Sequence, residues 1–245
     1  MKIKYGIVLE NTSWYKNVIK LFNSDLNYEI KEFTLYYDYQ KILRIKYKDI
    51  CEFYVITGSG ASNAASNSEF LINFNIDVLL RIGTVGALTN TLKIGDVVNI
   101  IAGIKGDGVT KYYLPDQIPA MANIKLFKSL SSYLESKLTI VEGIVFTTAA
   151  RFKENIEYLK KVVQYNVIGI EMETAAIFGV GLDKKIPTGS LCVVSDLPIN
   201  DQQNNPGIMN KRNYDIVENK FRKLFLEIIK WGSLVDIENI NYKWE

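Results

Sequence analysis

The sequence VIGIEMETAAIFGVGL, residues 167–182, passes directly from one structural pattern into another. Its first four residues form a short apolar run that is typical of a strand buried on both faces. Residues 172–182 instead space their apolar side chains three and four apart, as a helix does. A second apolar run, SLCVVS at residues 190–195, follows after a short connection. This order of strand, helix and strand favours a mostly parallel or mixed sheet that is covered by helices.

The same alternation continues along the rest of the chain, and residues 43–48 alternate like a strand near the edge of a sheet. Buried runs occur at residues 5–10, 52–57, 77–82, 95–101 and 139–146, and helical spacing at residues 13–22, 62–74, 124–138, 154–163 and about 208–231. The 245 residues contain no repeat, linker or low-complexity tract. We therefore predict the α/β fold class as a single domain over residues 1–245, with a central twisted mixed sheet flanked by helices.

The composition excludes several classes of function. The chain contains no histidine, which rules out Ser-His-Asp and Cys-His catalysis and any metal site with imidazole ligands. Its net charge of +2 gives no sign of a nucleic-acid or acidic-membrane partner. No targeting segment opens the chain, and no apolar run reaches the roughly 20 residues of a membrane span. We expect a soluble cytoplasmic protein with reduced core cysteines, no metal and no cofactor.

Two strand ends suggest an anion site, because loops and helix N-termini gather at the carboxyl ends of strands in such folds. Thr57-Gly-Ser-Gly-Ala-Ser-Asn63 is either a backbone cradle for an anion or only a tight turn into a helix. Arg81-Ile-Gly-Thr-Val-Gly86 puts an arginine next to a hydroxyl and two glycines. A buried arginine needs an anionic partner, which is either a phosphate or carboxylate ligand or a structural Asp or Glu.

Two further strand ends carry carboxylates. Glu171 and Glu173 flank Met172 where the buried strand passes into the helix. The two glutamates lie on one side if the strand continues, and they diverge by roughly 200° if the helix begins at once. A carboxylate there suits either sugar hydroxyls or the first turn of a helix. Asp196 ends a buried strand, so it is either a general acid in a water-poor setting or an N-cap residue.

In this order, the four segments resemble the nucleoside phosphorylase superfamily, whose members cleave the bond between a nucleobase and ribose. The similarity runs from about Tyr5 to Asp196 and continues more weakly into the last helix. The Glu-Met-Glu motif ending at Glu173 and the Ser-Asp motif ending at Asp196 are specific in this order and spacing. The resemblance implies a homo-oligomeric enzyme whose small-molecule partners are a purine nucleotide or nucleoside and possibly inorganic phosphate.

The resemblance also implies roles for individual residues, according to the part of the substrate that each would touch. Protonation of N7 makes a purine a better leaving group, and a nearby negative charge stabilises the cationic sugar. The implied residues are Asp196 as the acid; Glu173 and Met172 at the ribose; Phe152, Ile170 and Ser195 at the base; Arg81, Thr84, Gly58 and Ser59 at a phosphate; and, on loops, Arg151 and Lys105 as further anion contacts.

Two branches of the superfamily compete as models for this chain. The segments Tyr112–Ala120 and Ile186–Pro198 are similar to the AMP nucleosidase branch, in which water cleaves AMP to adenine and ribose 5-phosphate. The segment that begins at Arg81 is closer to the phosphorylases, where that arginine and the following threonine hold the attacking phosphate. We predict an AMP nucleosidase-like hydrolase, with a purine nucleoside phosphorylase and a non-catalytic nucleotide-binding sensor as alternatives.

The chain departs from the phosphorylase pattern at two places. The first-loop arginine of the phosphorylases is missing, since residues 9–13 are Leu-Glu-Asn-Thr-Ser. The methylthioadenosine nucleosidases use a glutamate in this region to activate water, and Glu10 lies about two residues out of that register. The histidine that many phosphorylases place at the ribose 5′ position of a neighbouring subunit is missing too. A 5′-phosphate on the substrate would make that contact unnecessary.

Overall fold

Eight predicted strands and two that were not predicted join into one ten-stranded sheet in a computed structural model, which describes residues 2–23, 25–34, 40–153, 155–199 and 211–240. The strands are β1 (Ile3–Leu9), β2 (Tyr28–Thr34), β3 (Lys41–Tyr47), β4 (Cys51–Thr57), β5 (Val78–Ala87), β6 (Val97–Gly106), β7 (Ala120–Met121), β8 (Ile140–Thr148), β9 (Val167–Glu171) and β10 (Thr188–Asp196). The helices are α1 (Thr12–Phe22), α2 (Ala61–Ile72), α3 (Ile124–Leu134), α4 (Ile156–Val163), α5 (Thr174–Asp183) and α6 (Lys211–Leu234). The predicted first residues of α4 and α6, Glu154 and residues 208–210, lie outside the described residues.

The sheet is mixed and partly closed on itself. Its strands lie in the order β10-β6-β8-β9-β5-β1-β4-β3-β2, with β7 paired to β6. β1 runs parallel to β4 and β5, whereas β3 runs antiparallel to β4 and β2. Because β10 pairs with both β6 and β5, the strands β5, β9, β8, β6 and β10 form a closed ring of hydrogen-bonded neighbours. The predicted fold class is confirmed, and the extent of a single domain over residues 1–245 stays a prediction.

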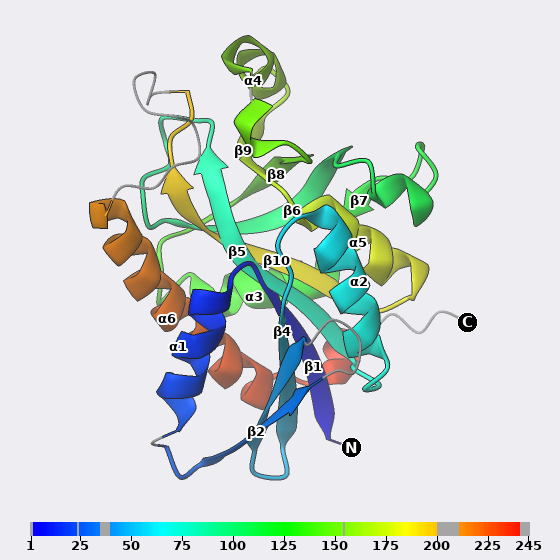
Figure 1. Cartoon of the computed structure of the whole chain (residues 1–245), viewed down its shortest axis with the longest axis vertical. Coiled ribbons are helices and arrows are strands. Elements are labelled where there is room, and N and C mark those ends of the chain that lie inside the picture. The colour runs from blue at the N-terminus through cyan, green and yellow to red at the C-terminus, as the bar shows by residue number, and fades with distance from the viewer. Residues whose placement is uncertain (1, 24, 35–39, 154, 200–210, 241–245) are drawn as a thin grey trace.

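Helices cover both faces of this sheet (Figure 1). Buried side chains of α1, α3 and α6 share one hydrophobic cluster with β1, β4 and β5. On the opposite face, α2 and α5 pack closely through small residues, Ala61 and Ala65 against Ala176 and Val180. Within the described part of the chain, no helix is both long enough and apolar enough to cross a membrane.

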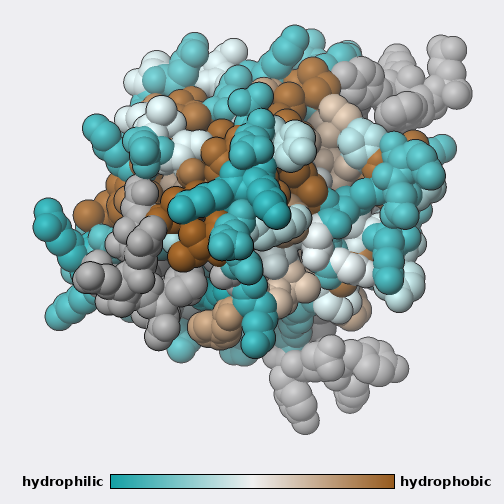
Figure 2. Space-filling model, turned by 90° about the horizontal axis from the view of Figure 1, so that it is seen from above, coloured by the Kyte–Doolittle hydropathy of each residue, from teal (hydrophilic) through white to brown (hydrophobic). Residues whose placement is uncertain are grey.

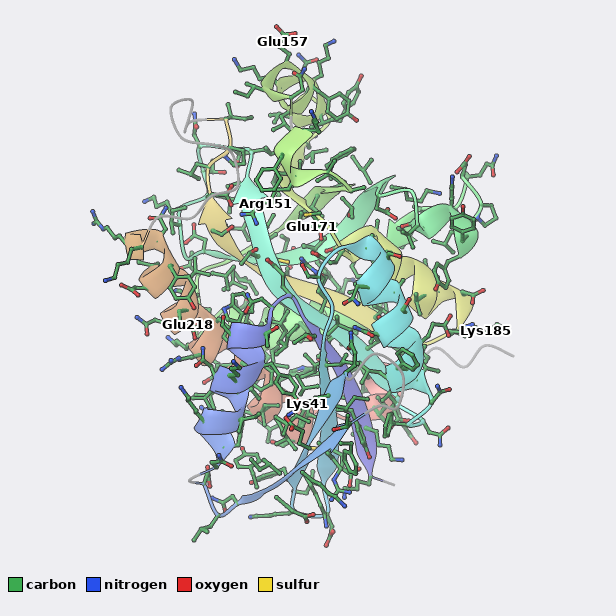
Figure 3. The ribbon with its side chains drawn as sticks, in the orientation of Figure 1. Lys41, Arg151, Glu157, Glu171, Lys185 and Glu218 are labelled. Atoms are coloured by element: carbon green, nitrogen blue, oxygen red, sulfur yellow. The ribbon has the colours of Figure 1, made fainter. Side chains whose placement is uncertain are left out.

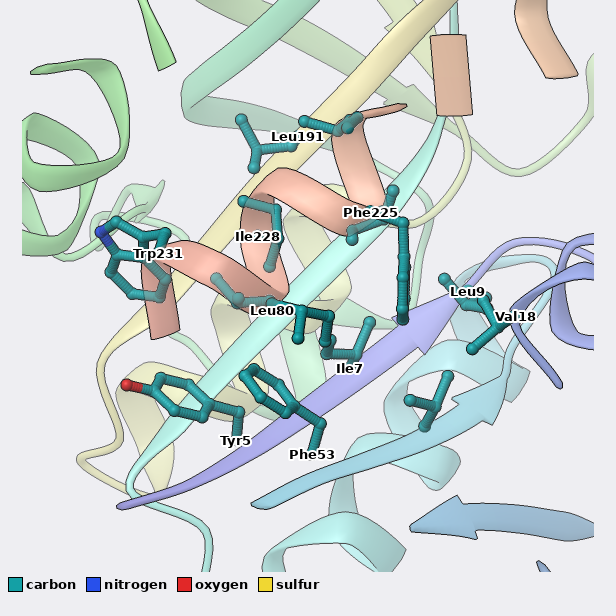
Figure 4. Close-up of a cluster of buried hydrophobic side chains, with 14 of the residues drawn as sticks. Tyr5, Ile7, Leu9, Val18, Phe53, Leu80, Leu191, Phe225, Ile228 and Trp231 are labelled. Carbon is teal, nitrogen blue, oxygen red and sulfur yellow. The ribbon is translucent and has the colours of Figure 1, made fainter. Parts of the chain in front are cut away.

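The long helix α6 lies across the sheet, and its side chains pack against those of β1, β4 and β5 (Figure 4). Four residues predicted on one helical face, Phe221, Leu224, Phe225 and Ile228, are all fully buried. Trp14 of α1 stacks on Phe221 with ring centroids 4.0 Å apart. The amphipathic pattern of the sequence therefore identified the buried face of α6 correctly.

Several strands differ from what the sequence predicts: β6 continues to Gly106, the two-residue β7 was not predicted, and β5 and β2 differ as follows. β5 continues past Ile82 and through both glycines to Ala87, so Arg81 lies within a strand rather than near its end. The extension is possible because β9 and β10 supply hydrogen-bond partners to it. At the other end of the sheet, β2 forms an edge that the sequence analysis did not predict. Its sequence YEIKEFT carries three charges on a half-exposed strand, a pattern that suits an edge.

Candidate active site

A pocket lies where β5, β9 and β10 end, and all four candidate segments contribute to it. Figure 3 shows Arg151 and Glu171 near the upper end of β5. The pocket is lined by Glu10, Ser59, Thr84, Val85, Gly86, Arg151, Ile170, Glu171, Met172, Glu173, Ser195 and Asp196. Side chains that are far apart in the sequence therefore meet at one site, as expected for the carboxyl ends of strands in an α/β sheet.

The Arg81 side chain is buried behind this pocket, with 1% of its surface exposed. Its Nη2 atom lies 2.5 Å from Glu173 Oε2, 3.3 Å from Glu171 Oε2 and 3.6 Å from Glu10 Oε2. The guanidinium folds over Gly83, where an added Cβ would lie only 2.6 Å from the guanidinium carbon. The sequence left two kinds of partner open for Arg81. The structure shows carboxylates of the protein itself, and a phosphate ligand for Arg81 stays a prediction.

The two glutamates of the Glu-Met-Glu motif converge because two residues separate strand from helix. β9 ends at Glu171 and α5 begins at Thr174. Glu171 Oε2 accepts hydrogen bonds from the backbone N–H groups of Glu173 and Thr174, both at 2.7 Å, which satisfies the first donors of α5. Glu173 Oε1 accepts the backbone N–H of Gly60 at 2.6 Å. Further lone pairs of the Glu173 carboxylate remain for hydroxyl groups of a ligand.

Glu10 follows β1 directly and its carboxylate lies in the pocket. The backbone N–H and the hydroxyl of Thr84 both donate to this carboxylate, the hydroxyl at 2.8 Å. The register explains the contact, because Leu9 of β1 pairs with Ile82 of β5, so the next residues of the two strands are neighbours. The offset of about two residues noted in the sequence therefore does not keep Glu10 out of the pocket.

Asp196 is the last residue of β10 and lines the pocket beside Ser195, whose hydroxyl donates to Asp196 Oδ1 at 2.6 Å. Gly86 lies opposite Asp196 in the sheet, and an added Cβ there would lie 3.2 Å from Asp196 Oδ2. The Pro198 ring lies over Gly86, with its Cγ 2.8 Å from such a Cβ, so the glycine makes room for Pro198 beside the carboxyl group. The described residues that follow, 197–199, form no helix, so Asp196 has no N-cap role among them.

We define the Arg81 cluster as Arg81 with Glu10, Glu171 and Glu173. Burial and the neighbouring charges both shift the pKa values of Glu173 and Arg81. Burial raises the pKa of Glu173 to about 7, although Arg81 acts in the opposite direction. Burial alone would lower the pKa of Arg81, but Cys192 and the three carboxylates raise it, so the guanidinium stays charged. When all three carboxylates are ionised, the cluster is negative. Such a cluster stabilises positive charge on a bound molecule.

Not every predicted site residue reaches the pocket. Phe152 is 77% exposed on a 3₁₀ turn and is not a lining residue. Gly58 donates its N–H to the carbonyl of Leu9 at 2.7 Å, which extends the pairing of β4 with β1 by one residue beyond Thr57. Lys105 donates to three backbone carbonyls of residues 115–118. The predicted residues that do line the pocket are Ser59, Thr84, Arg151, Ile170, Met172, Glu173, Ser195 and Asp196.

Val85 had no predicted role, Gly86 was considered only as one of two glycines beside an anion, and Glu10 and Glu171 were not among the predicted site residues. Val85 and Gly86 line the pocket because β5 is longer than predicted. The signal for Glu10 is its position directly after a strand of buried character. The strands parallel to β1 are β4 and β5, and both lead into candidate segments. Only the register between these strands shows which side chains meet.

Comparison with known proteins identifies the family of this chain. The profile of the Phosphorylase superfamily matches residues 8–230. The chain belongs to the phosphorylase superfamily. The resemblance predicted from the sequence is therefore confirmed, and the named relatives of this superfamily protein are phosphorylases and nucleosidases.

The relatives include both branches that the sequence left open. The DeoD-type purine nucleoside phosphorylase of Buchnera aphidicola subsp. Acyrthosiphon pisum (strain Tuc7) is 32% identical over 130 residues, 52% of this chain and 56% of that protein. The AMP nucleosidase of Escherichia coli (strain K12) is 31% identical over 166 residues, 63% of this chain and 34% of that protein. The uridine phosphorylase of Vibrio fischeri ES114 shares the fold, with a TM-score of 0.78 at 19% identity over 94% of this chain and 91% of that chain. The match spans about half of the curated phosphorylase.

Proposed function

We propose that this superfamily protein hydrolyses the N-glycosidic bond of a purine nucleotide, with AMP as the leading substrate and adenine and ribose 5-phosphate as products. The observation that carries the proposal is the single pocket shared by the carboxyl groups of Asp196, Glu173 and Glu10. These groups supply a proton donor, an acceptor for sugar hydroxyls and an acceptor for the proton of water. The similarity to the AMP nucleosidase over 63% of the chain supports AMP as substrate.

Asp196 acts on the departing base. A purine leaves ribose slowly because the departing nitrogen gains negative charge, and protonation of N7 removes that charge. The hydroxyl of Ser195, 2.6 Å from Asp196 Oδ1, orients the carboxyl group.

Glu173 acts on the sugar. Its carboxylate accepts hydrogen bonds from ribose hydroxyls, and the contacts strengthen as positive charge develops on the ribose ring. The negative Arg81 cluster adds to this stabilisation because it is buried and already oriented. Ile170 and Met172 line the same pocket and provide the apolar contact for sugar and base.

Glu10 acts on the nucleophile. Water attacks C1′ of the ribose, and the Glu10 carboxylate takes up the proton that the water loses. The N–H and hydroxyl of Thr84 hold this carboxylate in place. This assignment favours hydrolysis over attack by phosphate.

The 5′-phosphate of AMP would pair with Arg151, the exposed arginine that lines the pocket. We expect Arg151→Gln to lower kcat/KM for AMP about 10- to 100-fold and to leave that for adenosine unchanged, because the variant loses a charge-assisted hydrogen bond only with AMP. Lys153→Gln, which removes an exposed charge from the same 3₁₀ turn, is the matched control and should change neither value more than twofold. Equal losses for AMP and adenosine would contradict a phosphate contact.

A phosphorylase is the second candidate, since the 32% identical relative carries that name and Arg81 and Thr84 follow that pattern. Release of adenine from AMP and from adenosine, with and without inorganic phosphate, distinguishes the candidates. We expect adenine release from AMP in phosphate-free buffer, about 30- to 1000-fold more efficient than from adenosine. Strict dependence on phosphate would establish phosphorolysis instead. Saturable AMP binding without base release would leave a non-catalytic sensor.

The pH dependence of the reaction should reveal Glu173. Its pKa of about 7 means that it is protonated, and a poorer acceptor, at lower pH. We expect kcat/KM to fall about tenfold per pH unit below pH 7 and to level off above it. Glu173→Gln should lower kcat/KM and abolish the limb centred near pH 7. If kcat/KM of that variant still falls below pH 7, the fall belongs to another group, such as the substrate phosphate with its pKa of about 6.

We also propose that the protein works as a homo-oligomer in the cytoplasm. Figure 2 shows apolar side chains exposed between charged ones on one face of the protein, which suits a contact surface. Large exposed aromatic residues include Tyr112 at 80% and Tyr165 at 75% exposure. Both cysteines are buried free thiols, as in proteins of reducing compartments. Light scattering that finds a monomer at micromolar concentration would contradict the oligomer.

A further inference from the structure

The donors around the Glu10 carboxylate are those that bind an oxyanion. Thr84 offers its backbone N–H and its hydroxyl, and the Arg81 guanidinium lies 3.6 Å away. Backbone N–H groups, hydroxyls and arginine together are the usual partners of phosphate oxygens. In this chain, a carboxylate of the protein itself occupies these donors.

We propose that Glu10 selects the nucleophile by excluding inorganic phosphate from the donors of Thr84 and Arg81. A phosphate oxygen and a Glu10 oxygen cannot accept from the same Thr84 groups at the same time. An ionised Glu10 beside Glu171 and Glu173 also repels a phosphate anion. The inference rests on the proposed cleavage of an N-glycosidic bond, and it adds the reason why water rather than phosphate attacks.

Removal of the Glu10 side chain should then convert the site into a phosphate site. A phosphate oxygen would form the bond to C1′ while the bond from C1′ to the base nitrogen breaks. The electron pair of that bond stays on the base, and Asp196 donates its proton to N7. The products are the free base and a ribose 1-phosphate ester. Because Arg81 remains shared with Glu171 and Glu173, we expect only millimolar affinity for phosphate.

Phosphate binding tests this directly, without any nucleotide. Isothermal titration of inorganic phosphate into Glu10→Ala should show saturable binding with a Kd of about 1–10 mM. The parent protein and Glu10→Gln should show none up to 20 mM, roughly twice the weakest Kd expected for Glu10→Ala, because a side chain of the same size still fills the site. The exposed Glu135→Ala is the matched control and should behave like the parent. The double variant Glu10→Ala/Thr84→Val should bind phosphate at least fivefold more weakly than Glu10→Ala.

Several results would overturn the proposal. These are saturable phosphate binding by the parent, no binding by Glu10→Ala and by a second truncation, Glu10→Ser, or equal binding by Glu10→Gln and Glu10→Ala. Circular dichroism verifies that each variant is folded. If Glu10→Ala binds phosphate while no form of the protein releases a base, the proposed function is wrong, but the exclusion of phosphate by Glu10 is still supported. If the bond is cleaved, phosphate should speed base release by Glu10→Ala at least tenfold and leave the parent unchanged.

Discussion

Asp196→Asn is expected to lower base release about 10²- to 10⁴-fold and to leave nucleotide binding within a few-fold of the parent. Asparagine keeps the size of the side chain and an oxygen that can accept from Ser195, which lies 2.6 Å away. It has no proton to deliver to N7 of the base. Single-turnover kinetics give the chemical step, and equilibrium titration of AMP gives the binding constant.

Two comparisons show whether the lower rate of Asp196→Asn results from the loss of the general acid. Asp116→Asn removes a carboxylate from an exposed loop and should leave the rate unchanged. A substrate whose leaving group needs no protonation, such as one with nitrophenol in place of the purine, should lose much less than AMP in Asp196→Asn. Full activity of Asp196→Asn towards AMP would remove Asp196 from the role of acid.

Arg81→Met is expected to lower the free energy of unfolding by about 3–5 kcal/mol at pH 8. Methionine fills much of the same volume, but it leaves the carboxylates of Glu171 and Glu173 buried without their cation. For a chain of this size the loss corresponds to a decrease in Tm of roughly 6–20 °C. Thermal unfolding followed by circular dichroism measures it.

The destabilisation of Arg81→Met should decrease at pH 5. The pKa of Glu173 is already raised to about 7, and loss of Arg81 raises it further. A carboxyl group whose pKa is higher in the folded state destabilises the fold only as pH rises above its unfolded value of about 4.3. At pH 5 the group takes up a proton, so the penalty is small. Arg222→Met, at an arginine whose side chain is 47% exposed, should change stability by less than 1 kcal/mol at both pH values. A pH-independent loss in Arg81→Met would indicate a packing defect instead.

Local patterns in the chain were enough to identify the elements of the fold and the order of its motifs. Continuous apolar runs marked β1, β4, β8 and β10, because strands in the middle of a covered sheet are buried on both faces. The helical spacing marked the buried face of α6, because burial on one side of a helix repeats with its period. The seven-residue edge strand β2 was not predicted, because its charged residues suit solvent as well as a sheet edge. The motifs ending at Glu173 and Asp196 indicated the superfamily before any geometry was known.

The partners of individual side chains depended on the tertiary structure. The sequence allowed Arg81 a phosphate or a structural carboxylate, and only the folded chain brings Glu10, Glu171 and Glu173 around it. The position of Glu10 on Thr84 depends on the register between β1 and β5, whose paired residues, such as Leu9 and Ile82, are 73 positions apart in sequence. Local periodicity carries no information on such a register, because it is determined by packing between strands and by the closure of the ring from β5 to β10.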